Sequence, residues 1–389
     1  MIIAFDSWVF RSRHHNSGIY NYAKNILLEF GALVSATDDL TIRSFFTKGY
    51  SDEVLDLAAS PGIETLNTRL LRFHRLWQLG GVTAAAARAR ADLIFSPTSH
   101  TCPFGPFPVI TTIHDVTPVV SPSFRGAQNL LERLRLWSAA KFSVKCLTDS
   151  ECSKKDLVEA YGVPPHKVAV VYLGYDRETF NSAQADVVRQ KALFDRHKIR
   201  SPYIFHHGAV QPRKNLERLI RACQLLWERR RDFDFQLVLA GPLGWQYEAV
   251  LEAATKAGGK VILTGAVGDE DLALLIKGAG LCVIPSLYEG FCIPLVEAMA
   301  CGTPTIASNS SCLPEVSGGV LRYFDPFSIE DMASTVRMVL EDRSLQENLA
   351  TNGVKRASVF SWERCARETL SALLSTGWQF EWQSERSRI

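Results

Sequence analysis

The sequence predicts an α/β protein built from two Rossmann-like domains that face each other across a cleft. Three observations point to this fold class. The chain has 389 residues, which is too long for one small domain and suits two of about 170 to 190 residues. Short apolar runs alternate with longer helical patterns, as in parallel sheets covered by helices. The alternation restarts in the middle of the chain, which indicates two sheets rather than one.

The first domain is expected to span residues 1–175. A long helix over 18–34 follows the first strand, and the pattern is interrupted by Gly-Tyr-Asp at 174–176, where we place the boundary. The expected strands cover 1–5, 40–46, 92–95, 109–113, 144–148 and 168–171.

The second domain is expected to span residues 176–360, and a polar helical stretch at 181–200 leads into it. Helices are expected from Leu216 and near Pro294. The expected strands cover 203–206, 235–240, 260–263, 280–284 and 304–307. Residues 361–389 form a last helical pattern, which we expect to cross back to the first domain.

Composition narrows the function classes. The net charge is +2, from 43 basic and 41 acidic side chains, so nothing demands nucleic acid as a partner. The nine cysteines are scattered without a CxxC pair, which favours free thiols in a reducing compartment. Neither a leader pattern nor an apolar run of about 18 residues is present. We expect a cytoplasmic protein, with peripheral contact at the inner face of the membrane left open.

The strongest motif is the segment from Tyr288 to Glu297, in which two glutamates stand on either side of a helix start. Glu289 falls in the loop and Glu297 in the helix. Carboxylates suit sugar hydroxyls because they accept several hydrogen bonds, and a helix start suits phosphate. The backbone N–H groups of that start belong to Gly290, Phe291, Cys292 and Ile293. Without the rest of the motif, such a pair would indicate only that one glutamate stabilises the start of a helix and that the other is exposed to solvent.

A second motif places two cations in a strand-to-helix turn. Arg213 and Lys214 lie in the string Gln-Pro-Arg-Lys-Asn just before a helix. Cations at a helix start oppose the helix dipole, so an anion should offset them, and a diphosphate would do so. The alternative is a solvated turn.

Two weaker signals lie in the first domain. His114 and Asp115 follow a strand, at the edge where doubly wound sheets bind ligands. Gly18 opens the first long helix, where a glycine permits close approach of a ligand. Taken alone, His114 is better interpreted as a structural histidine, and Gly18 as the start of an ordinary helix.

Taken together, the motifs resemble a retaining glycosyltransferase of the large group-1 class, family 4, with the two-domain GT-B architecture. The resemblance covers nearly the whole chain and is strongest from 148 to 310. It rests on SGI at 17–19, HD at 114–115, TDSECSKKDLVEAYGVPPHKVAVVYLGYD at 148–176, HHGAVQPRKNL at 206–216, LAGP at 239–242, EGFCIPLVEAMACGTP at 289–304 and SWE at 361–363.

The resemblance implies a role for each motif residue. Glu297 would accept hydrogen bonds from ribose hydroxyls, and Glu289 would hold hydroxyls of the transferred sugar. Arg213 and Lys214 would clamp the diphosphate. His114 would contact the donor sugar. The phosphates would be bound by Gly18 and by the backbone N–H groups of Gly290, Phe291, Cys292 and Ile293. The catalytic set would be His114, Lys214 and Glu289, with no cofactor and no metal.

The sequence departs from the commoner pattern of such enzymes at three positions. Ala209 stands where many relatives carry Arg, so Arg213 would supply that charge. Cys292 stands where Gly is usual and narrows the space beside the sugar, and Tyr20 replaces a frequent second Gly. These departures bear on the identity of the donor.

The implied reaction is transfer of a hexose with retention of configuration, in surface polysaccharide synthesis. The motif combination resembles bacterial O-antigen, capsule and exopolysaccharide transferases, which favours mannose from GDP-mannose, with UDP-sugars as the other donor class. The acceptor would be a glycan or a lipid-linked glycan. The alternatives are a GT-B-like epimerase or phosphorylase and a catalytically silent glycan-binding partner subunit.

Residues 65–90 hold five arginines and no acidic side chain. Arg69, Arg72 and Arg75 recur at helical spacing, with Leu70, Leu71, Phe73, Leu76 and Trp77 between and beside them. Such a helix could lie on an anionic membrane. The alternative is an ordinary surface helix whose apolar side faces the core.

Overall fold

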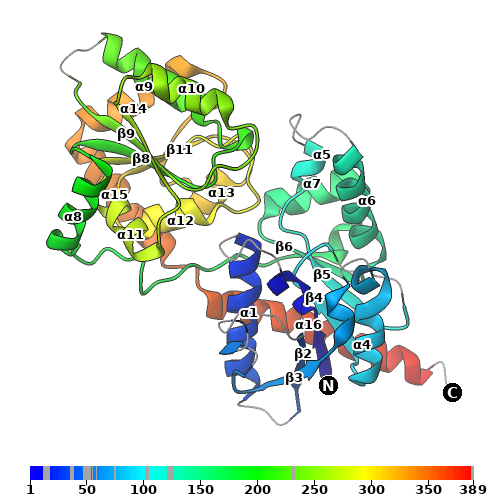
Figure 1. The fold of residues 1–389 in the computed structure, drawn as a ribbon. Helices are drawn as coiled ribbons and strands as arrows, with labels where there is room; N and C mark the ends of the chain where they lie inside the picture. The colour runs from blue at the N-terminus through cyan, green and yellow to red at the C-terminus, as the bar shows by residue number, and fades with distance from the viewer. Residues whose placement is uncertain are drawn as a thin grey trace. The chain divides into compact units, whose positions relative to one another are not determined.

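The computed structural model describes residues 1–11, 18–35, 39–46, 54, 56–57, 59–73, 76–100, 105–120, 127–229 and 233–386. Two compact units make up the chain, and each has its own parallel sheet (Figure 1). The first unit combines Met1–Gly174 with Trp362–Ile389, and the second is Tyr175–Ser361.

The first unit is built on a seven-stranded sheet with the order β3-β2-β1-β4-β5-β6-β7. Its strands are β1 (Ile2–Phe5), β2 (Thr41–Phe46), β3 (Ile63–Asn67), β4 (Leu93–Ser96), β5 (Val109–Thr112), β6 (Lys145–Thr148) and β7 (Val168–Val170). All neighbouring strands are parallel. The order reverses between β1 and β4, which is where doubly wound sheets open a crevice for ligands.

Helices cover the first sheet. They are α1 (Gly18–Val34), α4 (Val82–Arg88), α5 (Thr117–Val120), α6 (Ala127–Phe142), α7 (Glu151–Tyr161) and α16 (Trp362–Arg386). The described part of this unit also contains the short helical turns η1 (Ser7–Arg11), η2 (Arg69–Arg72), η3 (Trp77–Gly81) and η4 (Pro165–Lys167). The last helix, α16, packs against α1, so the end of the chain belongs to the unit in which the chain begins.

The arginine-rich segment does not form the single helix that the sequence indicated. Its first part is the edge strand β3 and the short turn η2, and a π-helical turn, η3, precedes α4. Leu71 and Trp77 are buried, whereas Phe73 is 59% exposed and Leu76 56% exposed. Arg75 lies outside the described residues. The apolar side chains between the arginines are therefore divided between the core and the surface.

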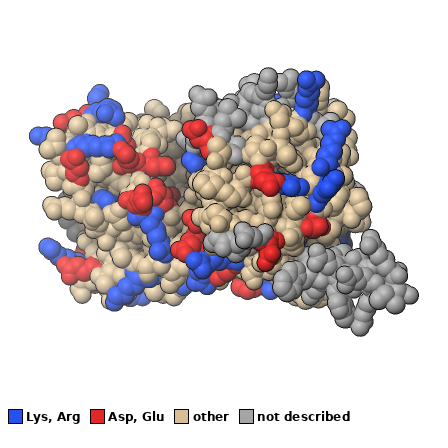
Figure 2. Space-filling view, turned by 90° about the horizontal axis from the view of Figure 1, so that it is seen from below, with Lys and Arg blue, Asp and Glu red and all other residues tan. Residues whose placement is uncertain are grey.

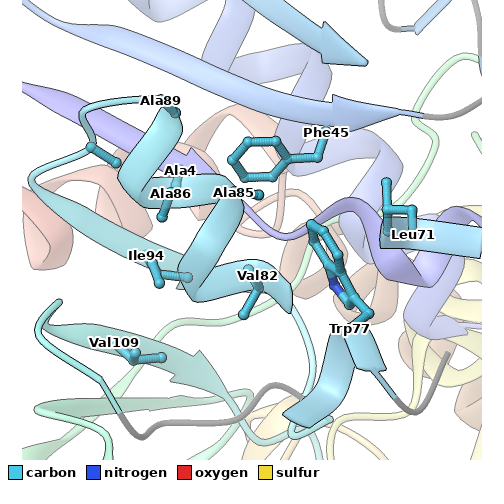
Figure 3. Close-up of a cluster of buried hydrophobic side chains, with 11 residues drawn as sticks. Ala4, Phe45, Leu71, Trp77, Val82, Ala85, Ala86, Ala89, Ile94 and Val109 are labelled. Atoms are coloured by element: carbon cyan, nitrogen blue, oxygen red, sulfur yellow. The ribbon is translucent and has the colours of Figure 1, made fainter. Parts of the chain in front are cut away.

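A cluster of buried side chains explains this division (Figure 3). The Trp77 ring packs edge-on against Phe45 of β2 with ring centroids 5.7 Å apart, and its Nε1 donates a hydrogen bond to Asp6 Oδ1 at 2.8 Å. The alanines of α4, Ala85 and Ala86, let that helix lie close to the sheet, where Val82 packs between Trp77 and Ile94 (Figure 3). Burial of an indole of this size is a large stabilising term.

The second unit is built on a six-stranded parallel sheet with the order β10-β9-β8-β11-β12-β13. The strands are β8 (Tyr203–His207), β9 (Gln236–Ala240), β10 (Val261–Gly265), β11 (Leu281–Ile284), β12 (Thr305–Ser308) and β13 (Arg322–Phe324). β8 and β11 lie at the centre and also mark the point where the strand order reverses. The loops after these two strands therefore meet at the expected ligand-binding edge.

Helices cover both faces of the second sheet (Figure 1). They are α8 (Val187–His197), α9 (Leu216–Arg229), α10 (Glu248–Lys256), α11 (Asp269–Gly278), α12 (Ile293–Ala300), α13 (Leu313–Ser317), α14 (Ile329–Glu341) and α15 (Arg343–Ala357), with a short turn η5 (Pro212–Lys214). Figure 1 shows α9, α10 and α14 on one face and α11, α12 and α13 on the other. Within these layers, α14 packs on α9, and α15 packs on α12.

The chain enters and leaves the second unit at one place. Arg177, just after the entry point, donates through Nε to the carbonyl oxygen of Phe360 at 3.0 Å and through Nη2 to that of Ser358 at 2.6 Å. Three hydrogen bonds from one guanidinium fix the two ends of the unit against each other, because hydrogen bonds that involve a charged donor are strong.

Acidic and basic side chains are interspersed over the face shown in Figure 2, in agreement with the small net charge. Among the described residues, none of the helices combines the length and the apolar character needed to cross a bilayer.

Candidate active site

The first part of the site is the turn between β8 and α9. Asn215 ends η5 in the left-handed conformation, with φ of 59°. Its buried side-chain amide donates to the carbonyl oxygens of Pro285 at 3.1 Å and Pro326 at 2.8 Å. Asparagine tolerates this conformation better than most residues. Asn215 thus fixes the preceding Arg213 and Lys214 against the loop that follows β11.

That second loop carries Glu289, and the two loops are held together by charge. Lys214 Nζ donates to Glu289 Oε1 at 2.6 Å, and Arg213 Nη1 donates to Glu289 Oε2. Ser286 Oγ donates to Oε1 at 2.7 Å, and the backbone N–H of Leu287 donates to the carbonyl oxygen of Arg213 at 2.7 Å. Lys214 and Glu289 are 4% and 5% exposed, so this pair is shielded from solvent.

The charge state of Glu289 follows from these contacts. Burial by itself would raise the pKa of its carboxyl, but the neighbouring Arg213 and Lys214 outweigh that effect and lower the pKa to about 2. Hydrogen bonds from Lys214 and Ser286 add to the lowering because they favour the charged form. Glu289 is therefore a carboxylate at neutral pH.

The anion that the two cations require is present in the chain itself. The sequence suggested a bound diphosphate as the counter-charge of Arg213 and Lys214, and Glu289 fills that position. Glu289 thus holds both cations side by side in one cluster. The separation in sequence between the partners is 75 and 76 residues, which is why the motifs did not reveal the pairing.

The third part is the start of α12. Cys292 precedes the helix with φ of 74° and ψ of 69°, a conformation that a residue with a Cβ adopts at a cost. Its side chain is buried, and burial followed by the charge of Glu289 raises the pKa of the thiol to about 12. Phe291 packs edge-on against Phe360 with centroids 5.3 Å apart, which anchors the loop. Gly290 and Ile293 are the other residues of this helix start.

Glu297 lies within α12, and its partner was not identified from the sequence. His207 Nε2 lies 2.8 Å from Glu297 Oε2, and the imidazole is almost fully buried. The neighbouring His206 is also buried, and its Nδ1 donates to the carbonyl oxygen of Val283 at 2.9 Å. Burial, and after it the nearby Lys214, lower the pKa of His206 to about 3. The sequence signals for these two residues were their position at the end of a strand and their place at the start of the string HHGAVQPRKNL, in which no role was assigned to either histidine.

A separate group of side chains lies in the first unit, around His114. Its Nδ1 lies 2.8 Å from Asp149 Oδ2 and its Nε2 lies 3.0 Å from the carbonyl oxygen of Pro97. Both partners are acceptors, so both ring nitrogens donate only when the ring is an imidazolium. Burial opposes that charge, but Asp149 and the carbonyl of Pro97 outweigh it and raise the pKa of His114. The Tyr22 ring packs edge-on against the imidazole.

Asp115 and Gly18 are the other two candidate residues of the first unit. Asp115 Oδ1 accepts a hydrogen bond from the backbone N–H of Thr117 at 2.9 Å, which is a local structural role. Gly18 is exposed as the first residue of α1, and a Cβ built there would meet no atom within 4 Å. The structure therefore brings Arg213, Lys214 and Glu289 into direct contact and places His114 and Gly18 in the other unit.

Two family models match consecutive parts of the chain. The model of group 1 glycosyl transferases matches residues 189–356, and that of glycosyltransferase family 4 matches residues 32–179. The first match contains η5, the β11–α12 loop and both glutamates, and the second contains His114 and Asp149.

Individual proteins agree with these matches. The O-antigen chain mannosyltransferase B of Escherichia coli is 29% identical over 294 residues, which are 74% of this chain and 76% of that protein. The sucrose-phosphate synthase of Thermosynechococcus elongatus superposes with a TM-score of 0.75 over 97% of this chain and 99% of that one, at 18% identity. HepE of Anabaena in complex with UDP and glucose superposes with a TM-score of 0.72 over 96% of this chain and 100% of that one, at 20% identity.

Three findings lead to the same family assignment: the two parallel α/β sheets, the family models that match both units, and the structural similarity over the whole chain. The predicted fold class is confirmed, and the chain belongs to the group 1, family 4 glycosyltransferases with the GT-B fold.

Proposed function

We propose that this glycosyltransferase moves a hexose from a nucleotide-sugar to a glycan or lipid-linked glycan during surface polysaccharide synthesis, with retention of anomeric configuration. The observation that carries the proposal is the buried cluster of Arg213, Lys214 and Glu289. It lies where the loops after the two central strands meet, and Glu289 fixes its two cations there. A diphosphate leaving group at this position would be stabilised by both cations.

The cluster suits the chemistry of such a transfer. The bond between the sugar and the diphosphate breaks with growth of negative charge on the phosphate oxygens. A preorganised cation or N–H group at that position stabilises the transition state by about 3 kcal/mol. Lys214 and Arg213 are held in place by Glu289 before any ligand arrives, so they need no reorganisation during the reaction.

We assign the remaining contacts by the same reasoning. The carboxylate of Glu289 would accept hydrogen bonds from hydroxyls of the transferred sugar, and Glu297 would accept them from the ribose. The N–H groups of Gly290, Phe291, Cys292 and Ile293 and the open start of α1 at Gly18 would contact the phosphates. His114 would contact the donor sugar. These assignments are proposals for the positions that match the family motifs.

For the donor we propose GDP-mannose. The support is the Escherichia coli relative, whose name is that of a mannosyltransferase. The complex of HepE with UDP and glucose concerns a protein of only 20% identity, and UDP-sugars remain the alternative that an experiment must separate.

The experiment is a calorimetric titration of the protein with GDP, UDP and ADP, followed by transfer assays with the sugar nucleotides of whichever base binds. A ligand that binds the native state also raises the melting temperature. We expect GDP to bind and Glu297→Gln to weaken it. Product formed from GDP-mannose without an acceptor would favour the epimerase, and no binding of any nucleotide to folded protein would favour a silent partner subunit.

A further inference from the structure

Glu297 is not presented to its ligand as an isolated carboxylate. It extends from α12, and its side chain is 14% exposed. One of its oxygens, Oε2, lies 2.8 Å from Nε2 of His207. A carboxylate only accepts hydrogen bonds, so the imidazole is the donor. This contact engages Oε2 of Glu297.

The donor is held rigidly. His207 is the last residue of β8, a central strand that is paired on both sides (Figure 1). Its ring stacks on that of Phe205, two residues earlier on the same face, with centroids 5.8 Å apart and planes inclined by 21°. Among the described residues, Nδ1 of His207 has no hydrogen-bond partner. Among the described residues, Glu297 is therefore the hydrogen-bond partner of the His207 ring.

We propose that His207 is a positioning residue that fixes the carboxylate of Glu297, so that Glu297 can accept the ribose hydroxyls of the donor. The inference rests on the proposed role of Glu297 in nucleotide binding. A buried side chain that can rotate must lose that freedom when the ligand binds, and a fixed donor removes this cost in advance. A binding group held by a second residue is also more selective, because its geometry cannot adapt to a ligand that lacks the hydroxyl.

The test compares ribose recognition between variants. The probes are GDP and UDP, each beside its 2′,3′-dideoxy form, and the measured quantity is the ratio of the two dissociation constants. His207→Phe keeps an aromatic ring that stacks on Phe205 but removes the donor. His207→Gln keeps an N–H donor that can reach the position of Nε2. Glu297→Gln keeps the shape but replaces the carboxylate.

We expect the wild-type protein to prefer the ribonucleotide by at least about tenfold, which corresponds to one good hydrogen bond. His207→Phe should lose most of that preference while its affinity for the dideoxy form stays unchanged. His207→Gln should recover part of the preference. A purely structural role of His207 would instead weaken both forms equally.

Each other outcome has its own meaning. If Glu297→Gln loses the preference and His207→Phe retains it, the positioning role is wrong although the assignment of Glu297 stands. If Glu297→Gln retains the preference, the proposed role of Glu297 fails and the role of His207 with it. If none of GDP, UDP and ADP binds the folded wild-type protein, the proposed function itself is overturned. Melting temperatures of the variants show whether each remains folded.

Discussion

The ammonium of Lys214 lies 2.6 Å from Oε1 of Glu289, and both side chains are buried. They come from loops 75 residues apart that follow the two central strands of one sheet. The pair serves the stability of the second unit and the electrostatics of the proposed donor site at once. Changes at this pair should therefore affect both properties.

Replacement of Glu289 by Gln should destabilise the protein strongly. Arg213 and Lys214 would both lose the carboxylate that contacts them, and Lys214 is buried. Breaking a buried ion pair in this way costs about 3 to 5 kcal/mol. Denaturant unfolding at neutral pH measures the loss. The matched control is Glu217→Gln, whose partner Arg221 lies on the exposed surface of α9 and whose cost should stay below about 1 kcal/mol. Equal effects of the two changes would contradict the structural role of Glu289.

The same cluster predicts sensitivity to acid. The pKa of Glu289 is about 2 in the folded protein, against an ordinary value of 4.5. A depressed pKa contributes stability that is fully present above the unfolded value and is lost as the pH falls from 4.5 toward 2. The free energy of unfolding of the wild-type protein should therefore fall more steeply over this range than that of Glu289→Gln. Parallel pH profiles of the two proteins would show that the carboxylate is not held in its charged form.

The contact between His114 and Asp149 predicts the opposite dependence on pH. The folded state raises the pKa of His114, so the protonated ring contributes stability below its ordinary value of 6.5, down to the pH at which Asp149, whose pKa burial also raises, takes up a proton. This stabilisation is lost as the pH rises through the raised folded pKa. Asp149→Asn keeps an acceptor for Nδ1 but removes the charge. The difference in unfolding free energy between wild type and variant should be larger near pH 6 than near pH 9, and a constant difference would exclude the imidazolium.

Gly18→Ala should separate ligand binding from stability. A Cβ at Gly18 meets no atom within 4 Å, so the folded protein should be as stable as the wild type within about 0.5 kcal/mol. If the start of α1 approaches the phosphates, the methyl group should weaken nucleotide binding about tenfold, a change of about 1.4 kcal/mol. Gly31→Ala serves as the contrast, because its Cβ would lie 2.6 Å from the carbonyl oxygen of Pro61 and should destabilise the fold. Unchanged affinity in Gly18→Ala would remove Gly18 from the proposed site.

Contact with an anionic membrane remains a prediction for the arginine-rich segment. Leu76 and Leu79 of this segment are 56% and 78% exposed, and exposed apolar side chains beside arginines favour interfacial binding. The double change of Leu76 and Leu79 to Gln should reduce co-sedimentation with anionic vesicles, and added salt should reduce it further. The control is the double change of Val187 and Val188, which are 65% and 80% exposed in the other unit. Absence of vesicle binding by the parent protein would refute membrane contact.

Most strands could be predicted from the sequence because they are buried in the middle of a sheet. Such strands are continuous apolar runs, and the observed limits of β8 and β9 differ from the predicted ones by one residue. The two strands that were missed, β3 and β13, lie at sheet edges. β3 has the sequence IETLN with exposed positions, and β13 has only three residues. An edge strand needs no apolar run, so its sequence resembles that of a loop.

The arginine-rich segment was misread for a related reason. The spacing of Arg69 and Arg72 fits a helix, and the structure forms only a 3-10 turn there. Burial of Trp77 between Phe45 and α4 fixes the course of this segment. A contact with a strand so far away in sequence carries no local signal.

By itself, the sequence determined the two parallel α/β units and the kinds of chemical group in the candidate site, because strand burial, helix starts and the family motifs are local patterns. Only the tertiary structure decided which groups meet. It paired Glu289 with Lys214 and Arg213, Glu297 with His207, and His114 with Asp149. Parallel sheets bring together the ends of strands that are far apart in sequence, so the partner of each site residue lies beyond the reach of a local pattern.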